Sequence, residues 1–123
     1  MQPLWPLSFL LTIETGMPHL EENLRYAVTR SEQCLSRKDL DSVFPILQHP
    51  SLAGCKLREQ SADADTIVYV LVCDHSAGTT GTATWHLGEH VIRGTLDVKL
   101  GGKNMTFFQR VTGRPVGECP SVG

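Results

Sequence analysis

The sequence predicts a mainly β protein: an antiparallel meander sheet or partly open barrel of about seven strands, with one short helix. Residues 81–113 alternate apolar and polar side chains in three runs separated by glycine turns, and residues 66–72 form the most β-prone run of the chain. The length of 123 residues suits one core, so we expect a single domain over residues 1–123.

Gly88-Glu89 and Gly101-Gly102 are the expected two-residue turns of the segment 81–113, because Gly supplies the positive φ that tight hairpins need. The register that follows pairs Trp85 with Ile92, Ala83 with Gly94, Gly81 with Leu96, Val98 with Met105, Leu96 with Phe107 and Ile92 with Val111.

One face of this unit is predicted to be polar, as in an antiparallel sheet with one buried face. It carries Thr82, Thr84, His86, Arg93, Thr95, Asp97, Lys99 and Thr106. Phe108 falls on the same face, opposite Thr95. An exposed aromatic there indicates an interface with a partner protein or a second subunit.

The chain is expected to begin with a strand from Leu4 to Thr15. Pro3 and Pro6 at its start favour an edge position, where a missing N–H is tolerated. A second strand is predicted over Leu24 to Gln33, ending near Cys34.

One short helix is expected after Cys34. Ser36 is a good N-cap with Asp39 three residues later, apolar residues follow at helical spacing, and Pro45 and Pro50 kink or stop the helix. Its apolar stripe would cover the sheet, with a ligand lid as the alternative.

Cys55 to Gln60 and Thr66 to Asp74 are predicted to form a hairpin whose second arm is a central strand, because it is apolar on both faces. A turn centred at Ala64 sets Cys55 opposite Cys73, Leu57 opposite Leu71 and Glu59 opposite Tyr69. Cys55 and Cys73 can then form a disulfide, which leaves Cys34 to pair with Cys119. Two disulfides indicate an oxidising compartment, and four buried thiols in a cytosolic protein are the alternative.

The charge is nearly balanced, with 11 basic and 13 acidic residues, so no overall field favours nucleic acid or an anionic membrane. No apolar run is long enough for a transmembrane segment. Residues 1–11 lack a basic start and a cleavage site, so they are interpreted as part of the fold. If the protein is exported, we expect its leader to be missing from this chain and Met1 to be an added start.

Several short motifs recur in one known family: Leu4-Trp5, Gly16-Met17-Pro18, Gln33-Cys34-Leu35, Gly54-Cys55, Cys73, the Gly101-Gly102 turn and the closing Arg114, Gly117 and Cys119. With them the chain resembles the small bacterial proteins grouped as domain of unknown function 3617. The resemblance implies an exported, periplasmic β-rich domain with no established activity, and it supplies no catalytic residues. The chain departs from that family at Pro3, where a Gly is usual.

The polar motifs of the sequence give no cofactor or metal site. His86 and His90 have the spacing of a helical ligand pair, but a tight turn between them sends the two side chains to different faces. Asp74, His75 and Ser76 are adjacent on a loop and cannot converge on one reacting atom as a triad does. The Asn104 sequon just after a turn is interpreted as incidental.

Large apolar residues are the remaining candidates. They are weak ligand-binding candidates for a cavity between sheet and helix, with core packing as the default interpretation: Trp5, Tyr69, Trp85, Met105 and Phe107. The preferred hypothesis is a non-enzymatic envelope protein that binds a small apolar molecule or a partner protein, with a homodimer as one form of partner. The alternative is a small barrel-like enzyme that uses His75, His86 or His90 as general acid or base.

Overall fold

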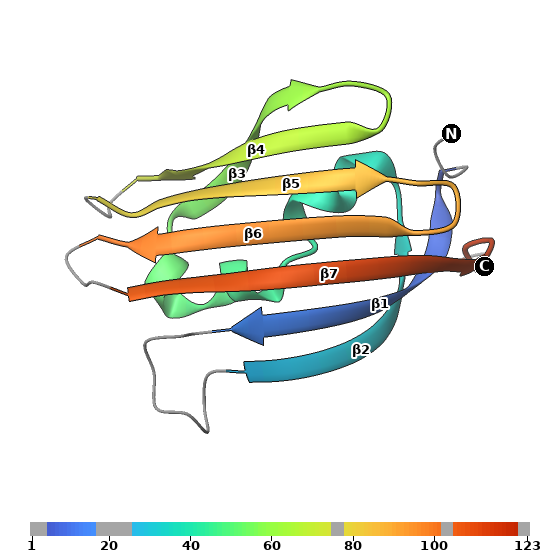
Figure 1. The fold of residues 1–123 in the computed structure, drawn as a ribbon, viewed down its shortest axis with the longest axis horizontal. Helices are drawn as coiled ribbons and strands as arrows, with labels where there is room; N and C mark the ends of the chain where they lie inside the picture. Colours follow the sequence, from blue (N-terminus) through green and yellow to red (C-terminus); the bar gives the residue numbers. More distant parts are fainter. Residues whose placement is uncertain (1–4, 17–25, 75–77, 102–104, 121–123) are drawn as a thin grey trace.

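The computed structural model describes residues 5–16, 26–74, 78–101 and 105–120, and these form one open antiparallel sheet of seven strands (Figure 1). The mainly β prediction is therefore confirmed. The strands are β1 (Leu7–Gly16), β2 (Tyr26–Leu35), β3 (Cys55–Ala62), β4 (Thr66–Cys73), β5 (Thr80–Leu87), β6 (Ile92–Leu100) and β7 (Met105–Gly117).

The strand order is β2-β1-β7-β6-β5-β4-β3, so the last strand of the chain pairs with the first. Strands β3 to β7 form a meander, and β4 is paired on both sides, with β3 and β5, as the prediction of a non-edge strand requires. The prediction of an edge position for β1 is wrong, because β1 lies between β2 and β7. Its strand begins at Leu7, after Pro6, so neither proline interrupts the two ladders that β1 makes.

The two edge strands, β2 and β3, are consecutive in the chain, so their connection must cross the whole sheet. It does so as three 3₁₀ helices, η2 (Arg37–Ser42), η3 (Pro45–Gln48) and η4 (Pro50–Leu52). The helical segment lies where it was expected, but it is not one helix. Pro45 and Pro50 each stand at the start of a new 3₁₀ helix, because proline fits the first turn and cannot continue the preceding one.

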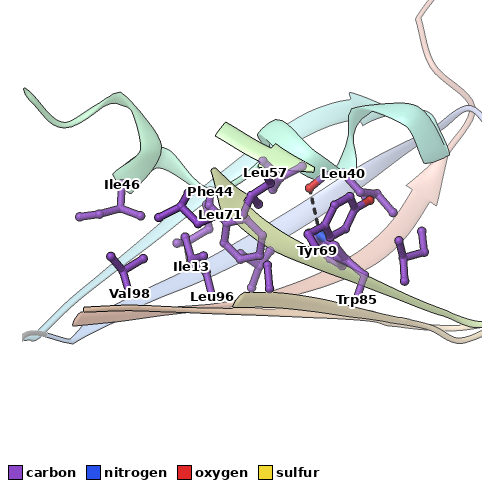
Figure 2. Close-up of a cluster of buried hydrophobic side chains, with 14 of the residues drawn as sticks. Ile13, Leu40, Phe44, Ile46, Leu57, Tyr69, Leu71, Trp85, Leu96 and Val98 are labelled. Carbon is purple, nitrogen blue, oxygen red and sulfur yellow. Dashed lines mark hydrogen bonds between the residues drawn. The ribbon is translucent and has the colours of Figure 1, made fainter. Parts of the chain in front are cut away.

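The core lies between the inner face of the sheet and this connection (Figure 2). Strand residues alternate across the sheet, and the inward ones are apolar and buried, for example Leu11, Ile67, Trp85 and Leu96. Leu40, Phe44, Ile46 and Leu52 of the connection and its junctions close the core from the other side.

The register of the β3–β4 hairpin is the predicted one from Cys55 opposite Cys73 to Glu59 opposite Tyr69. In the β5–β6 and β6–β7 hairpins the predicted pairs are wrong by two residues. Leu87 pairs with Ile92 and Leu100 with Met105, so each turn has four residues instead of two. Trp85 is therefore opposite Gly94, and Phe108 is opposite Asp97 rather than Thr95. Because the shift is even, every residue keeps its predicted face.

Candidate functional site

The inward-facing ligand candidates contribute to the core. Trp85 is fully buried, its indole Nε1 donates a hydrogen bond of 2.9 Å to the carbonyl oxygen of Leu40, and its ring lies 5.6 Å from that of Phe44 (Figure 2). Phe107 is buried on the same face. The connection therefore packs directly onto Trp85, whose ring a ligand in this space would contact.

Trp5 lies beside the same core, half-buried, with its ring 5.5 Å from the ring of Phe9. Its Nε1 is buried and has no hydrogen-bond partner among the described residues. The side chain of Met105 lies outside the part that the structure describes. The ligand-binding role of these residues stays a prediction.

Tyr69 combines a buried ring with a hydroxyl near two carboxylates. It lines a cavity of about 440 Å³ together with Arg37, Lys38, Asp41 and Glu59. Burial, and then the negative charges of Asp41 and Glu59, raise the pKa of the Tyr69 phenol to about 12. The phenol is therefore protonated at neutral pH and available as a hydrogen-bond donor.

A larger cavity, of about 590 Å³, opens on the outer face of the sheet over the ends of β4 to β7. Seven outward-facing residues line it: Val70, Thr80, Thr82, Asp97, Lys99, Thr106 and Phe108. The remaining lining residues are Leu71, Gly81, Val98 and Phe107, which lie next to them in the strands. No residue of the 3₁₀ connection contributes to the lining, whereas three core residues do: Leu71, Val98 and the ligand candidate Phe107. We call it the Phe108 pocket.

Two neighbouring rows of the outer face form the Phe108 pocket. Thr80, Lys99 and Thr106 are paired across β5, β6 and β7, and next to them Val70, Thr82, Asp97 and Phe108 are paired across β4 to β7. The pocket thus offers apolar walls, hydroxyls, one carboxylate and one ammonium group. That combination suits the binding of an amphipathic molecule.

Phe108 forms one wall of the pocket and is half-buried. Its ring covers Gly16 of β1, where a Cβ would collide with it, and the guanidinium carbon of Arg110 lies 4.6 Å from the ring centroid. The cation–π contact holds the ring at the pocket edge. The sequence placed Phe108 on the polar face, but alternation alone did not reveal the pocket around it.

The described histidines do not line the Phe108 pocket. His86 is exposed, and its Nδ1 is 3.5 Å from Oγ1 of Thr66, which in turn donates to Oδ1 of Asp65 at 3.2 Å. His90 is exposed in the β5–β6 turn, and His75 lies outside the described residues. Within the described part of the chain, no three His, Cys, Asp or Glu side chains gather in a way that could hold a metal ion.

Both predicted disulfides are confirmed. Cys55 and Cys73 are bonded across the β3–β4 hairpin with 4.0 Å between their Cα atoms, and Cys34 is bonded to Cys119 with 5.4 Å between Cα atoms. Ser8 of β1 pairs with Cys34 on one side and with Gly117 on the other. The second bridge therefore joins β2 to the segment after β7 across β1.

Comparisons with protein-family models, curated proteins and solved structures found no match. Across residues 5–16, 26–74, 78–101 and 105–120, no helix is long and apolar enough to cross a membrane.

Proposed function

We propose that this chain is an exported, non-enzymatic binding protein and that the Phe108 pocket receives its ligand. The observation that carries the proposal is the pocket itself: about 590 Å³ on the outer face of a sheet whose inner face is occupied by core packing. Two disulfides support an oxidising compartment such as the periplasm. No family model matches the chain, so the resemblance to the domain of unknown function 3617 family, which implies the same location, is part of this proposal.

The lining defines the class of ligand. Val70 and Phe108 provide apolar contact area, whereas Lys99 and Asp97 lie one row apart on the same strand and can fix a polar or charged end. A small molecule with an apolar body and one anionic or hydrogen-bonding end fits these groups.

Binding of the anionic dye 8-anilinonaphthalene-1-sulfonate tests the pocket. Phe108→Ser removes the aromatic wall, and we expect it to weaken dye binding roughly tenfold, as the loss of one buried aromatic contact predicts. Val116→Ser is the matched control, because it removes an exposed apolar side chain outside the pocket. Equal dye binding by Phe108→Ser and wild type would contradict the proposal.

A second copy of the chain is the other occupant that the pocket supports, because Phe108 stays partly exposed. Sedimentation velocity distinguishes the two occupants. A wild-type dimer that Phe108→Ser converts to a monomer assigns the pocket to self-association. A monomer that binds the dye assigns it to a small molecule, and native mass spectrometry of protein from its own host would then show the bound mass.

The acid–base enzyme is less well supported. Thr66 lies between His86 and Asp65 in the hydrogen bonds described above, and all three residues line a smaller cavity of about 220 Å³. General acid–base catalysis needs the base within hydrogen-bond reach of a substrate held in a site. His86 is exposed and lies outside the Phe108 pocket.

A further inference from the structure

The outer face of the sheet carries most of the positive charge of the chain. Strand alternation and pairing direct seven basic side chains to this face: Arg30, Lys56, Arg58, Arg93, Lys99, Arg110 and Arg114. Among the described strand residues, three carboxylates share it, those of Glu14, Glu32 and Asp97. The turn carboxylate of Asp65 adjoins the same face, where it lines a cavity with the outward-facing Thr66, His86 and Arg93. Seven basic groups against these four carboxylates leave the described part of the face with an excess of three positive charges.

The rest of the described chain is acidic. Arg37 and Lys38 are its basic residues, against seven carboxylates on the 3₁₀ connection, the inner edge of β3, the turns and the end of β7: Asp39, Asp41, Glu59, Asp63, Asp74, Glu89 and Glu118. A net charge of −2 thus hides a strong separation of charge. Such a field orients the molecule and draws its basic face toward an anionic partner.

Exposed apolar side chains lie among the arginines on strands β7, β1 and β2. Leu10 and Val28 are 43% and 45% exposed, and both are on the outer face. Leu10 is paired with Arg114 of β7 and with Glu32 of β2. Val28 is paired with Glu14 of β1, which Arg110 of β7 neighbours on its other side. Arg30 lies on β2 between Glu32 and Val28, so the arginines around the two apolar side chains are interleaved with two carboxylates. We call Leu10, Val28, Arg30 and Arg114 the outer patch.

We propose that the outer patch docks the protein onto the surface of an anionic phospholipid membrane. Arginine guanidinium groups suit phosphate, and exposed aliphatic side chains next to them can enter the boundary between headgroups and acyl chains. Leu10 and Val28 gain nothing from an acidic polysaccharide, which would use the cations alone. Single-stranded nucleic acid favours successive stacking aromatics, and the four residues of the outer patch include none.

This inference does not depend on the ligand of the Phe108 pocket. None of the four patch residues lines that pocket. A failure of vesicle binding would therefore leave the dye-binding experiment unaffected, and the reverse also holds.

Co-sedimentation of the full chain with lipid vesicles tests the proposal. The probes are vesicles of phosphatidylcholine alone and vesicles in which about one third of the lipid is phosphatidylglycerol, at low salt and at about 0.15 M salt. We expect binding to the anionic vesicles that weakens at the higher salt. Arg30→Gln and Arg114→Gln should each reduce the partition coefficient about fivefold, the typical contribution of one basic side chain near an anionic surface.

Lys38→Gln is the matched control, because it removes the same charge from an exposed position on the acidic side. Leu10→Ser and Val28→Ser should also weaken vesicle binding while leaving its salt dependence unchanged. All five variants alter exposed residues, and circular dichroism checks that they fold.

Equal losses in Lys38→Gln and Arg114→Gln would overturn the proposal, because net charge rather than the patch would then govern binding. Absence of binding to anionic vesicles would also overturn it. Tighter binding to heparin or to an oligothymidine than to the vesicles, unaffected by Leu10→Ser, would assign the basic face to a polyanion instead of a membrane.

Discussion

Trp85 lies where the sheet and the 3₁₀ connection meet, and it stabilises their contact in two ways. Its ring is fully buried against Phe44, and its N–H satisfies the carbonyl oxygen of Leu40, which is otherwise enclosed in the core. Gly94 opposite it is required for space, since a Cβ there would lie 2.7 Å from the indole ring. The indole ring of Trp85 therefore occupies the space that a side chain at position 94 would need.

Trp85→Phe should therefore lower the free energy of unfolding by about 2–3 kcal/mol, through the cavity and the unpaired Leu40 carbonyl. Trp5→Phe is the matched comparison, because the same atoms are removed but the indole N–H has no partner among the described residues. It should cost about 1 kcal/mol or less. Urea unfolding of both variants measures the difference, and equal losses would contradict the role of the Leu40 hydrogen bond.

Tyr69 supplies a residue-scale prediction about pH. The pKa of its phenol is raised from an ordinary value of 10.0 to about 12 by burial and by the charges of Asp41 and Glu59. The folded state thus favours the protonated phenol. The stability linked to it is fully present below pH 10 and is lost as the pH rises from about 10 through 12.

Ultraviolet titration of phenolate absorbance measures this directly, because the chain has two tyrosines. We expect Tyr69→Phe to remove the step near pH 12 and to leave the other. If the variant instead lost a step near pH 10, the raised pKa would be wrong.

At the scale of elements, turn length explains most of what the sequence could not predict. The cysteine positions predict the β3–β4 register correctly from Cys55 opposite Cys73 to Glu59 opposite Tyr69. In the β5–β6 and β6–β7 hairpins, the glycine pairs suggest turns of two residues, but each turn has four. In the β5–β6 turn, the N–H of Gly88 donates a 2.9 Å hydrogen bond to the carbonyl oxygen of Val91, which closes a turn longer than the predicted two residues. Side-chain alternation still assigns each face correctly because two-residue shifts preserve it.

The candidate site shows the same limit. Alternation put Asp97, Lys99, Thr106 and Phe108 on the outer face, but a pocket between them depends on the pairing of four strands. The separation of charge likewise follows from which face each strand residue takes. Neither feature is visible in a composition or in a single motif.

Gln109 connects three elements and gives the element-scale prediction. Its side chain is buried on the inner face of the sheet. Oε1 accepts a 3.1 Å hydrogen bond from the N–H of Ile46, and Nε2 donates a 2.8 Å hydrogen bond to Oγ1 of Thr15. It therefore fixes η3 over β7 and β1. A buried polar side chain with both ends paired is costly to replace, because its partners are left unsatisfied.

Gln109→Met keeps the approximate volume and removes both hydrogen bonds. It should lower the free energy of unfolding by about 2–3 kcal/mol. Gln48→Met, an identical change at an exposed position of η3, should cost less than about 0.5 kcal/mol. Thermal unfolding of the two variants provides the comparison, and a neutral Gln109→Met would show that the connection is held by apolar packing alone.

At the scale of the whole molecule, the two disulfides act over very different lengths of chain. Cys55 and Cys73 are 18 residues apart and bridge a hairpin that its own ladder already pairs, whereas Cys34 and Cys119 are 85 residues apart. The long bridge ties edge strand β2 to the segment after β7 across β1. It thereby closes a loop that holds more than half of the chain in the unfolded state.

Replacing Cys34 and Cys119 together by Ala should cost about 4.5 kcal/mol of stability, and replacing Cys55 and Cys73 about 3 kcal/mol, because a longer closed loop removes more entropy from the unfolded chain. Urea unfolding of the two double variants gives the order, and non-reducing peptide mapping of the wild type verifies the pairing. Each variant keeps the other bridge, so each serves as the control for the other. A larger loss from the short bridge would show that local packing of the β3–β4 hairpin, and not chain entropy, determines what these disulfides contribute.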